Sequence, residues 1–120
     1  MLFYGNVIWL APFLQDNVSY DPVRDFVPVT LAANSPTVLV LHPSVPAKSV
    51  KELMALAKTR PGELNYASGG SGSSSHLAGE LFKAMAGVKI ERIHYELGGA
   101  AITDLLGGHV QIVSGVLKVV

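Results

Sequence analysis

The sequence predicts an α/β protein with a mainly parallel sheet and flanking helices, and three observations lead to this prediction. Short apolar runs alternate along the chain with stretches whose apolar residues recur at helical spacing. Glycine-rich connections follow several of the short runs and lead into the helical stretches. The composition, 49% hydrophobic and 15% charged, provides the apolar side chains for a buried core and is too apolar for a disordered chain.

The regular pattern starts at Thr37. Thr37–Leu41 is a β-branched apolar run between two prolines, which predicts a buried strand. Ser49 and Glu52 have the spacing of a capping box, in which the serine caps the first turn and the glutamate reaches back to the Ser49 amide. The predicted helix ends at Arg60-Pro61-Gly62. Its apolar residues fall at helical spacing and are Val50, Leu53, Met54 and Ala57.

The remaining strands and helices follow in alternation. Leu64–Ala67 predicts a second strand, and the helix after it ends at Gly87. We expect one face of this helix to be apolar, with Leu77, Ala78, Leu81, Phe82 and Met85 on it. A third strand is predicted over Ile90–His94, and a short helix over Ala100–Leu106 that stops at Gly107-Gly108. A fourth strand is predicted over Val110–Val113.

The first 36 residues differ, since prolines interrupt them and the only strand signals are weak, such as Phe26–Leu31. They are interpreted as part of another lobe. The first 14 residues are apolar, but the first basic residue is Arg24, so we expect no signal peptide in this chain. A membrane-spanning helix needs about 20 apolar residues, and Gln15 ends this run earlier. The run is therefore interpreted as a buried strand and loop and not as a membrane span. At the other end, the apolar tail Val116–Val120 has no cap or turn residues.

The loop Ser68–Ser75, of glycine and serine only, is the strongest functional signal. Glycines bring backbone amides close to a ligand, and a helix start supplies unpaired amides and the positive end of its dipole. Together with the serine hydroxyls, these groups predict a site for a carboxylate or phosphate. The alternative is an exposed connector in which Ser73 or Ser74 is a plain helix cap. Gly98–Ala101 occupies an equivalent position after a strand, where ligands of α/β sheets bind.

Phosphate and hydrolase motifs fit the loop poorly. A P-loop needs a lysine next to Ser or Thr after its glycines, and the loop is followed by no lysine before Lys83. The dinucleotide-binding fingerprint requires a third glycine where this chain has Ser75. The nucleophile elbow of hydrolases requires a final glycine where this chain has Ser73. Ser71 and His76 could form a hydrolase pair, but nothing nearby completes a triad, and His76 is interpreted as lining the loop.

Composition excludes further classes of function. With nine basic and nine acidic residues the net charge is zero, so no overall field attracts nucleic acid. No cysteine is present, which excludes disulfides and thiolate metal sites. The histidines His42, His94 and His109 show no metal-ligand spacing, so no metal and no cofactor is expected. The pair Glu91-Arg92 is interpreted as a solvated face.

Several segments resemble the Bug-type solute receptors, the extracytoplasmic binding proteins of tripartite tricarboxylate transporters. These segments are Tyr20–Val29, His42–Leu53, Pro61–Ser68, Gly72–Phe82 and Thr103–Val110. The resemblance covers nearly all of residues 4–113 and matches a middle portion, well under half, of a family member. It implies a periplasmic-binding-protein fold of the type II, Venus-flytrap kind that is incomplete in this chain.

The resemblance also implies a function. Such a receptor is not an enzyme; it holds a small carboxylate in the periplasm for the membrane subunits of the transporter. It implies a partial lobe one over 1–42 and a partial lobe two over 43–120 that carries the anion-binding loops. The implied ligand-binding residues are Ser68, Gly69, Gly70, Ser71, Gly72, Ser73, Ser74, Ser75, His76, Gly98, Gly99, Ala100 and Ala101, with Asn6 as a weaker candidate from lobe one. Glu96 departs from the family, which commonly has a basic residue there.

Two alternatives stay open at this point. One is a truncated, non-functional product that self-associates non-specifically. The other is an enzyme domain that uses the glycine and serine loop as a cradle for a phosphate or an oxyanion, for which the sequence offers no positioned base or nucleophile.

Overall fold

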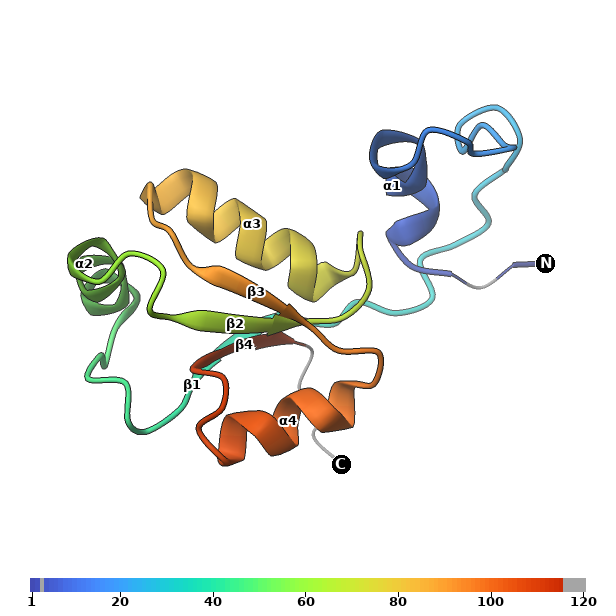
Figure 1. The fold of residues 1–120 in the computed structure, drawn as a ribbon. Helices are drawn as coiled ribbons and strands as arrows, with labels where there is room; N and C mark the ends of the chain where they lie inside the picture. Colours follow the sequence, from blue (N-terminus) through green and yellow to red (C-terminus); the bar gives the residue numbers. More distant parts are fainter. Residues whose placement is uncertain (3, 116–120) are drawn as a thin grey trace.

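The computed structural model describes residues 1–2 and 4–115 (Figure 1). Within this part the elements are α1 (Val7–Leu14), β1 (Val38–Leu41), α2 (Val50–Thr59), β2 (Asn65–Ser68), α3 (Ser74–Ala86), β3 (Glu91–His94), α4 (Gly98–Leu106) and β4 (Ile112–Gly115). The strands form one sheet in the order β1-β4-β2-β3. β2 runs parallel to both β3 and β4, whereas β1 is antiparallel to β4. The predicted α/β class with a mainly parallel sheet is confirmed.

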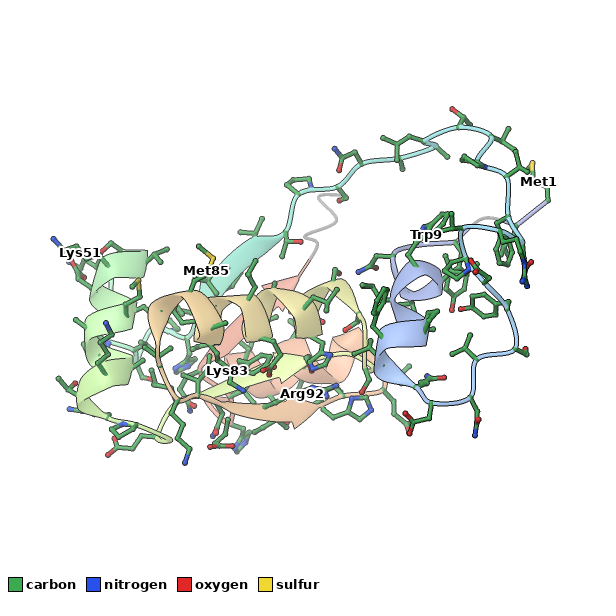
Figure 2. The ribbon with its side chains drawn as sticks, turned by 90° about the horizontal axis from the view of Figure 1, so that it is seen from above. Met1, Trp9, Lys51, Lys83, Met85 and Arg92 are labelled. Atoms are coloured by element: carbon green, nitrogen blue, oxygen red, sulfur yellow. The ribbon has the colours of Figure 1, made fainter. Side chains whose placement is uncertain are left out.

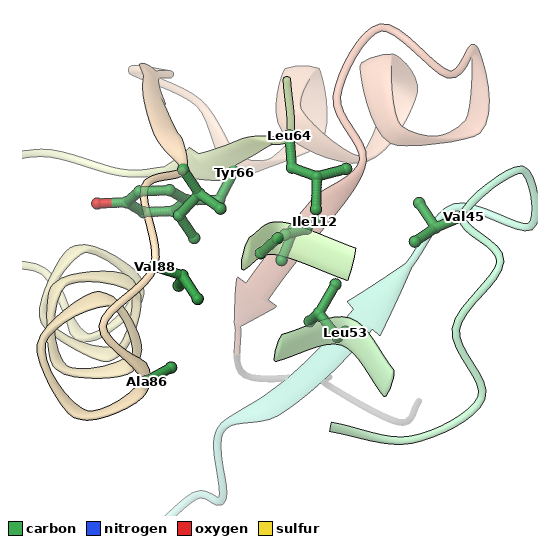
Figure 3. Packing of buried hydrophobic residues seen from close by; sticks show 9 residues of the cluster. Val45, Leu53, Leu64, Tyr66, Ala86, Val88 and Ile112 are labelled. Carbon is green, nitrogen blue, oxygen red and sulfur yellow. The ribbon is translucent and has the colours of Figure 1, made fainter. Parts of the chain in front are cut away.

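Helices cover both faces of the sheet, α2 and α3 on one face and α4 on the other (Figure 1). Successive strand residues point to opposite faces, so neighbours in β2 enter different cores. Tyr66 belongs to the cluster under α2 and α3, which includes Leu53 and Ile112 (Figure 3). Ala67 belongs to the cluster under α4, with Leu105. The two loops that follow β2 and β3 therefore stand on a sheet that is packed from both sides.

α2 begins and ends where the sequence predicts. Ser49 Oγ accepts the Glu52 N–H at 3.2 Å, so the serine is the helix cap. The glutamate, however, accepts the N–H of Lys48 at 2.7 Å and not that of Ser49, so the return bond of the predicted capping box falls one residue earlier. Leu53 and Ala57 are buried, as their helical spacing predicts.

The face that α3 turns to the sheet overlaps only in part with the predicted one: Phe82 packs against the core, whereas two other predicted residues do not. Leu81 and Met85 are 60% and 80% exposed, and Met85 stands on the outer side of the helix (Figure 2). The physical reason is Gly79, which is buried and lets the helix backbone approach the Tyr66 ring directly. This close approach turns the smaller residues Gly79 and Ala86 toward the sheet, and the expected apolar face is only partly buried.

A hydrogen bond between Tyr66 and Glu80 also holds α3 against the sheet on the side of Gly79. Tyr66 is 1% exposed, and its hydroxyl donates to Glu80 Oε1 at 2.7 Å; Lys83 Nζ donates to the same oxygen at 3.0 Å. Burial raises the pKa of Tyr66 well above its usual range, and the bond to Glu80 acts in the same direction. The hydrogen bonds from Tyr66 and Lys83 hold the pKa of Glu80 below its usual value. The buried phenol is therefore satisfied, which is a requirement for a tyrosine in a core.

The amino-terminal segment contradicts the prediction of a buried strand and loop. Val7–Leu14 is the helix α1, and only Ala11 in it is buried. Its sequence is apolar at nearly every position, so it carries no alternation that would separate a helix from a strand. A helix satisfies its backbone groups without a neighbouring strand, and that favours the helix here. Phe26–Leu31 forms no strand, so this weak signal was also misleading.

β1 is a strand as predicted, but it is not buried. Val38 and Leu39 are each 38% exposed, because β1 lies at the edge of the sheet. Since β1 pairs with β4, a boundary between lobes before Val38 fits the sheet better than the predicted one after His42; the division itself stays a prediction. The tail Val116–Val120 lies outside the described residues. Within the described part, the helices are too short or too polar to span a bilayer.

Candidate functional site

The two predicted loops leave the sheet at the same edge. β2 and β3 are parallel neighbours, and Ser68 is the register partner of His94. The pairing continues beyond the strands, because the Tyr95 N–H donates to the Ser68 carbonyl at 2.9 Å. The loop after β2 then enters α3, and the connection after β3 enters α4 on the other face of the sheet (Figure 1). Both helix starts thus lie beyond the carboxyl ends of adjacent strands, the usual ligand position in such sheets.

Hydrogen bonds within the loop Ser68–Ser75 hold it in one conformation. Ser75 Oγ accepts the Gly69 N–H at 3.0 Å, and the Gly70 carbonyl accepts the Ser73 N–H at 3.0 Å. Gly72 has a φ of +82°, which favours glycine at this point. Ser73 caps α3, since its Oγ accepts the N–H of His76 at 3.3 Å. The loop is therefore an ordered turn with a cap, and not a free connector.

Only some of the backbone amides remain open for a ligand. The Ser73 amide, one of those expected to bind an anion, is occupied by the Gly70 carbonyl. Within residues 4–115 the amides without a hydrogen-bond partner in this loop are those of Gly70, Ser71, Ser74 and Ser75. They include two at the start of α3, where the helix dipole favours negative charge.

Arg92 belongs to this site, so its interpretation as part of a solvated face was wrong. Its Nε donates to Ser68 Oγ at 2.6 Å and its Nη2 donates to the Gly69 carbonyl at 2.9 Å. His94 Nδ1 lies 3.1 Å from the same carbonyl. Alternation along β3 puts Arg92 and His94 on one face, and the register with β2 brings that face to the loop. The sequence signal that could have found Arg92 is a basic residue near the end of a strand predicted to neighbour the loop.

His76 lines the loop, as predicted. Its Nδ1 accepts the Gly72 N–H at 3.1 Å, which requires that this nitrogen carry no proton. Burial lowers the pKa of His76, and the positive charge of Arg92 lowers it further, while Glu80 opposes the effect. In the described structure the ring is directed to the Gly72 amide, and no hydrogen bond joins it to Ser71. The hydrolase pair of Ser71 and His76 therefore has no geometric support.

We expect the stability of the chain to fall more steeply between pH 7.5 and pH 5.5 than it does in His76→Gln. The folded state lowers the pKa of His76, so the unfolded chain takes up a proton first as the pH falls through about 6.5. The neutral His76 ring therefore contributes to the stability of the folded chain above about pH 6.5, and this contribution is lost at lower pH. The lowered pKa of Glu80 causes a further loss of stability at more acidic pH. Urea unfolding at several pH values measures the slope. His109→Gln, at an exposed histidine, is the control, and an unchanged slope in His76→Gln would contradict the assignment.

Asn6 lies next to the loop, and it is the residue that precedes α1, a helix that the sequence did not predict. Its Nδ2 donates to the Gly72 carbonyl at 3.4 Å, a long bond between residues that are 66 positions apart. Leu14 of α1 also packs here, because a Cβ on Gly72 would lie 2.8 Å from Leu14 Cδ1. These contacts give α1 a role in supporting the loop, and the Asn6 carbonyl also accepts the N–H groups of Trp9 and Leu10 at the start of α1.

The second loop offers two open amides. α4 begins at Gly98 without a side-chain cap, and a Cβ at Gly98 or Gly99 would meet no atom within 4 Å. The Ala100 N–H is already taken by the Leu97 carbonyl at 3.1 Å, and Ala101 is buried in the core under α4. Of the four residues predicted here, the glycines are therefore the accessible donors. Glu96 is exposed beside them.

A hollow of about 420 Å³ lies elsewhere, between the β1–α2 connection and α2. Two of its lining side chains have partners nearby: His42 Nδ1 lies 2.7 Å from Ser44 Oγ, and Glu52 accepts the Lys48 amide at 2.7 Å. Among the residues that the structure describes, it is a wide, open hollow lined by no helix start with free amides, so the two loops are the better candidate site.

Comparison with known proteins places these features in a family. The sequence model of the tripartite tricarboxylate transporter family receptor matches residues 2–120. Protein BugT of Bordetella pertussis is 40% identical over 95 residues, which are 79% of this chain and 29% of BugT. The UPF0065 protein of the tcbD-tcbE intergenic region of a Pseudomonas species is 39% identical over 100 residues, 83% of this chain and 30% of that protein. The chain thus spans less than a third of the length of these curated relatives.

Solved structures give the same result for the fold. Rpa4515 of R. palustris, solved with adipate, has a TM-score of 0.74 and 39% identity; the match covers 84% of this chain and 34% of that one. MatC from Rhodopseudomonas palustris, solved with bound malate, has a TM-score of 0.75 and 27% identity over 93% of this chain and 37% of that one. Both ligands of these similar proteins are small dicarboxylates.

Proposed function

Because this chain belongs to the tripartite tricarboxylate transporter receptor family, we propose that its two loops bind one carboxylate group of a small solute. The resemblance to Bug-type receptors is confirmed by the family match, and with it the type II periplasmic-binding-protein class. The family consists of periplasmic solute-binding receptors and not of enzymes, so the interpretation as an enzyme domain is set aside.

The observation that carries this proposal is the pair of helix starts at one edge of the sheet. Gly70, Ser71, Ser74 and Ser75 present open amides at the start of α3, and Gly98 and Gly99 do so at α4. Donors without acceptors, next to two positive dipole ends and the guanidinium of Arg92, suit an anion. The adipate and malate of the similar structures support a dicarboxylate of that size.

The strength of such a site can be bounded. A hydrogen bond to a charged group contributes about 1.5–3 kcal/mol, and a helix end adds about 0.3–1 kcal/mol, or up to about 2. Three such bonds and two helix ends give roughly 5–13 kcal/mol, from which association removes at least about 4. The middle of that range leaves about 5 kcal/mol, an affinity on the order of 0.1–1 mM. Tight binding therefore needs a second lobe that closes over the ligand and excludes water.

We extend the proposal to the receptor as a whole. Asn6 and α1 represent the other lobe beside the loop, since they contact it through Gly72. The receptor acts in the periplasm and delivers its solute to the membrane subunits of a tripartite tricarboxylate transporter. Its ligand-binding residues remain those of the two loops, now with Arg92 behind them.

Titration of the ¹⁵N-labelled chain with adipate or malate tests the site. We expect shifts of the amide signals of Gly70, Ser74, Ser75, Gly98 and Gly99, saturating in the range of 0.1–1 mM or above. The neutral diamide of adipic acid, which has the same length and no charge, is the control and is expected to give no shifts.

A variant checks the second loop. Gly98→Pro removes one amide donor at the first position of α4, where proline is tolerated, and we expect about tenfold weaker binding without a loss of stability. Shifts that cluster away from both loops, or equal binding of the diamide, would contradict the proposal.

A further inference from the structure

We propose that Arg92 is a positioning residue, which fixes the orientation of the Gly69–Gly70 peptide and so turns the Gly70 amide toward the anion. The consequence for binding rests on the proposed function of the loop. The structural part does not, since it concerns a peptide orientation in the chain without ligand. Figure 2 shows Arg92 on β3, near the start of α3.

The Gly69 carbonyl is held by several donors. Arg92 Nη2 donates to it at 2.9 Å, His94 Nδ1 lies 3.1 Å away, and the Ser68 hydroxyl donates at 3.2 Å. The Arg92 guanidinium also donates from Nε to Ser68 Oγ at 2.6 Å. Two adjacent nitrogens of one rigid fork therefore hold two neighbouring acceptors, a geometry that a single ammonium group does not reproduce. Ser68 is 2% exposed, so this anchor is fixed by the sheet.

Peptide geometry carries the effect to the next residue. The chain contains no cis peptide in its described part, and in a trans peptide the C=O and the N–H point in opposite directions. With the Gly69 carbonyl held toward Arg92, the Gly70 N–H points away from it. No acceptor within residues 4–115 takes that N–H, and a Cβ at Gly70 would meet no atom within 4 Å. The amide therefore points away from the arginine, and on an exposed residue it is left without an acceptor in the described chain.

The orientation needs a clamp because both residues of this peptide are glycines. Glycine populates positive and negative φ almost equally, so a rotation of the Gly69–Gly70 peptide meets little steric resistance. In the rotated state the loop would present a carbonyl oxygen in place of the amide, and an anion would meet a partial negative charge. Arg92 therefore acts on the ligand through the peptide, in addition to the positive charge that it contributes.

The test compares Arg92→Lys and Arg92→Gln with the unchanged 120-residue chain. Lysine keeps the charge but loses the fork, and glutamine loses both. Arg60→Gln is the matched control, because Arg60 is an exposed arginine at the end of α2. The first measurement is the backbone signal of Gly70 and the Gly69 carbonyl shift by NMR without ligand. The second is adipate and malate affinity by titration, and the sheet amides of β2 and β4 report whether each variant is folded.

We expect both Arg92 variants to move or split the Gly69 and Gly70 signals and Arg60→Gln to leave them unchanged. Where the parent chain binds a dicarboxylate, we expect both Arg92 variants to bind it about tenfold more weakly. Unmoved Gly69 and Gly70 signals in the folded Lys variant would overturn the inference, as would full affinity in that variant, which would assign Arg92 a role of charge alone. If the parent chain binds neither acid, the proposed function fails, whereas the NMR comparison still decides the role of Arg92.

Discussion

The isolated 120-residue chain is expected to bind a hydrophobic dye and to self-associate at micromolar to millimolar concentrations. Large apolar side chains stand in solvent on several elements: Phe13 is 83% exposed on α1, Leu31 is 81% exposed, and Met85 is 80% exposed on α3. The radius of gyration of the Cα atoms is 16.1 Å, against about 13.6 Å for a compact domain of this length. Exposed apolar area of this kind marks an interface or an aggregation hazard. Light scattering over a concentration series and dye fluorescence measure both effects.

The elements responsible can be separated by substitution. Phe13→Ser removes an exposed aromatic ring from α1, and Met85→Gln removes an exposed side chain from α3 without changing the net charge. We expect each change to lower dye binding and the apparent mass, because neither side chain is buried within the described chain. A parent chain that stays monomeric at about 1 mM and binds no dye would show that these surfaces are harmless, contrary to the expectation.

Gly79→Ala is expected to destabilise the chain by about 1–3 kcal/mol, although alanine is the better helix former by about 1 kcal/mol. A Cβ on Gly79 would overlap the Tyr66 ring, with the ring Cζ only 2.6 Å away. The ring cannot move aside, since Tyr66 is 1% exposed and its hydroxyl is bonded to Glu80. α3 would have to lift from the sheet, and that shift would also displace the start of α3 next to the loop Ser68–Ser75. The change is read from urea unfolding at a concentration where the chain is monomeric.

A control on the same helix isolates the clash. Ala84→Gly, at an exposed position of α3, is expected to cost about 1 kcal/mol through helix propensity alone. If Gly79→Ala proved as stable as the parent or more so, the close approach of α3 to Tyr66 would be refuted.

Local signals made α2 and α3 predictable. Ser49 and Ser73 cap α2 and α3, and Gly87 ends α3 in the left-handed conformation, each through bonds to residues nearby in sequence. The two loops could be placed for the same reason, because each is framed by a strand and a helix start. The contact between Arg92 and Ser68 could not be predicted, since it depends on the pairing of β2 with β3 and joins residues 24 positions apart.

The errors share a physical origin in contacts between distant parts of the chain. Val38 was expected to be buried because of its apolar neighbours, but sheet order decides burial, and β1 is an edge strand. The apolar run at Val7–Leu14 fitted both a strand and a helix, and it had no alternation to decide between them. Leu81 and Met85 followed helical spacing, yet Gly79 set which face of α3 approaches the sheet.

The hydrogen bonds of the loop Ser68–Ser75 also bear on the sign of charge that the proposed site would accept. The carbonyl oxygen of Gly69 accepts from Arg92, that of Gly70 accepts from Ser73, and that of Gly72 accepts from Asn6 at 3.4 Å. An ammonium group or a metal cation needs such oxygens as ligands, and these three are already engaged by donors of the chain itself. If the loop binds its solute as we propose, these bonds favour an anion over a cation, and we expect a zwitterionic solute to approach the loop with its carboxylate end foremost.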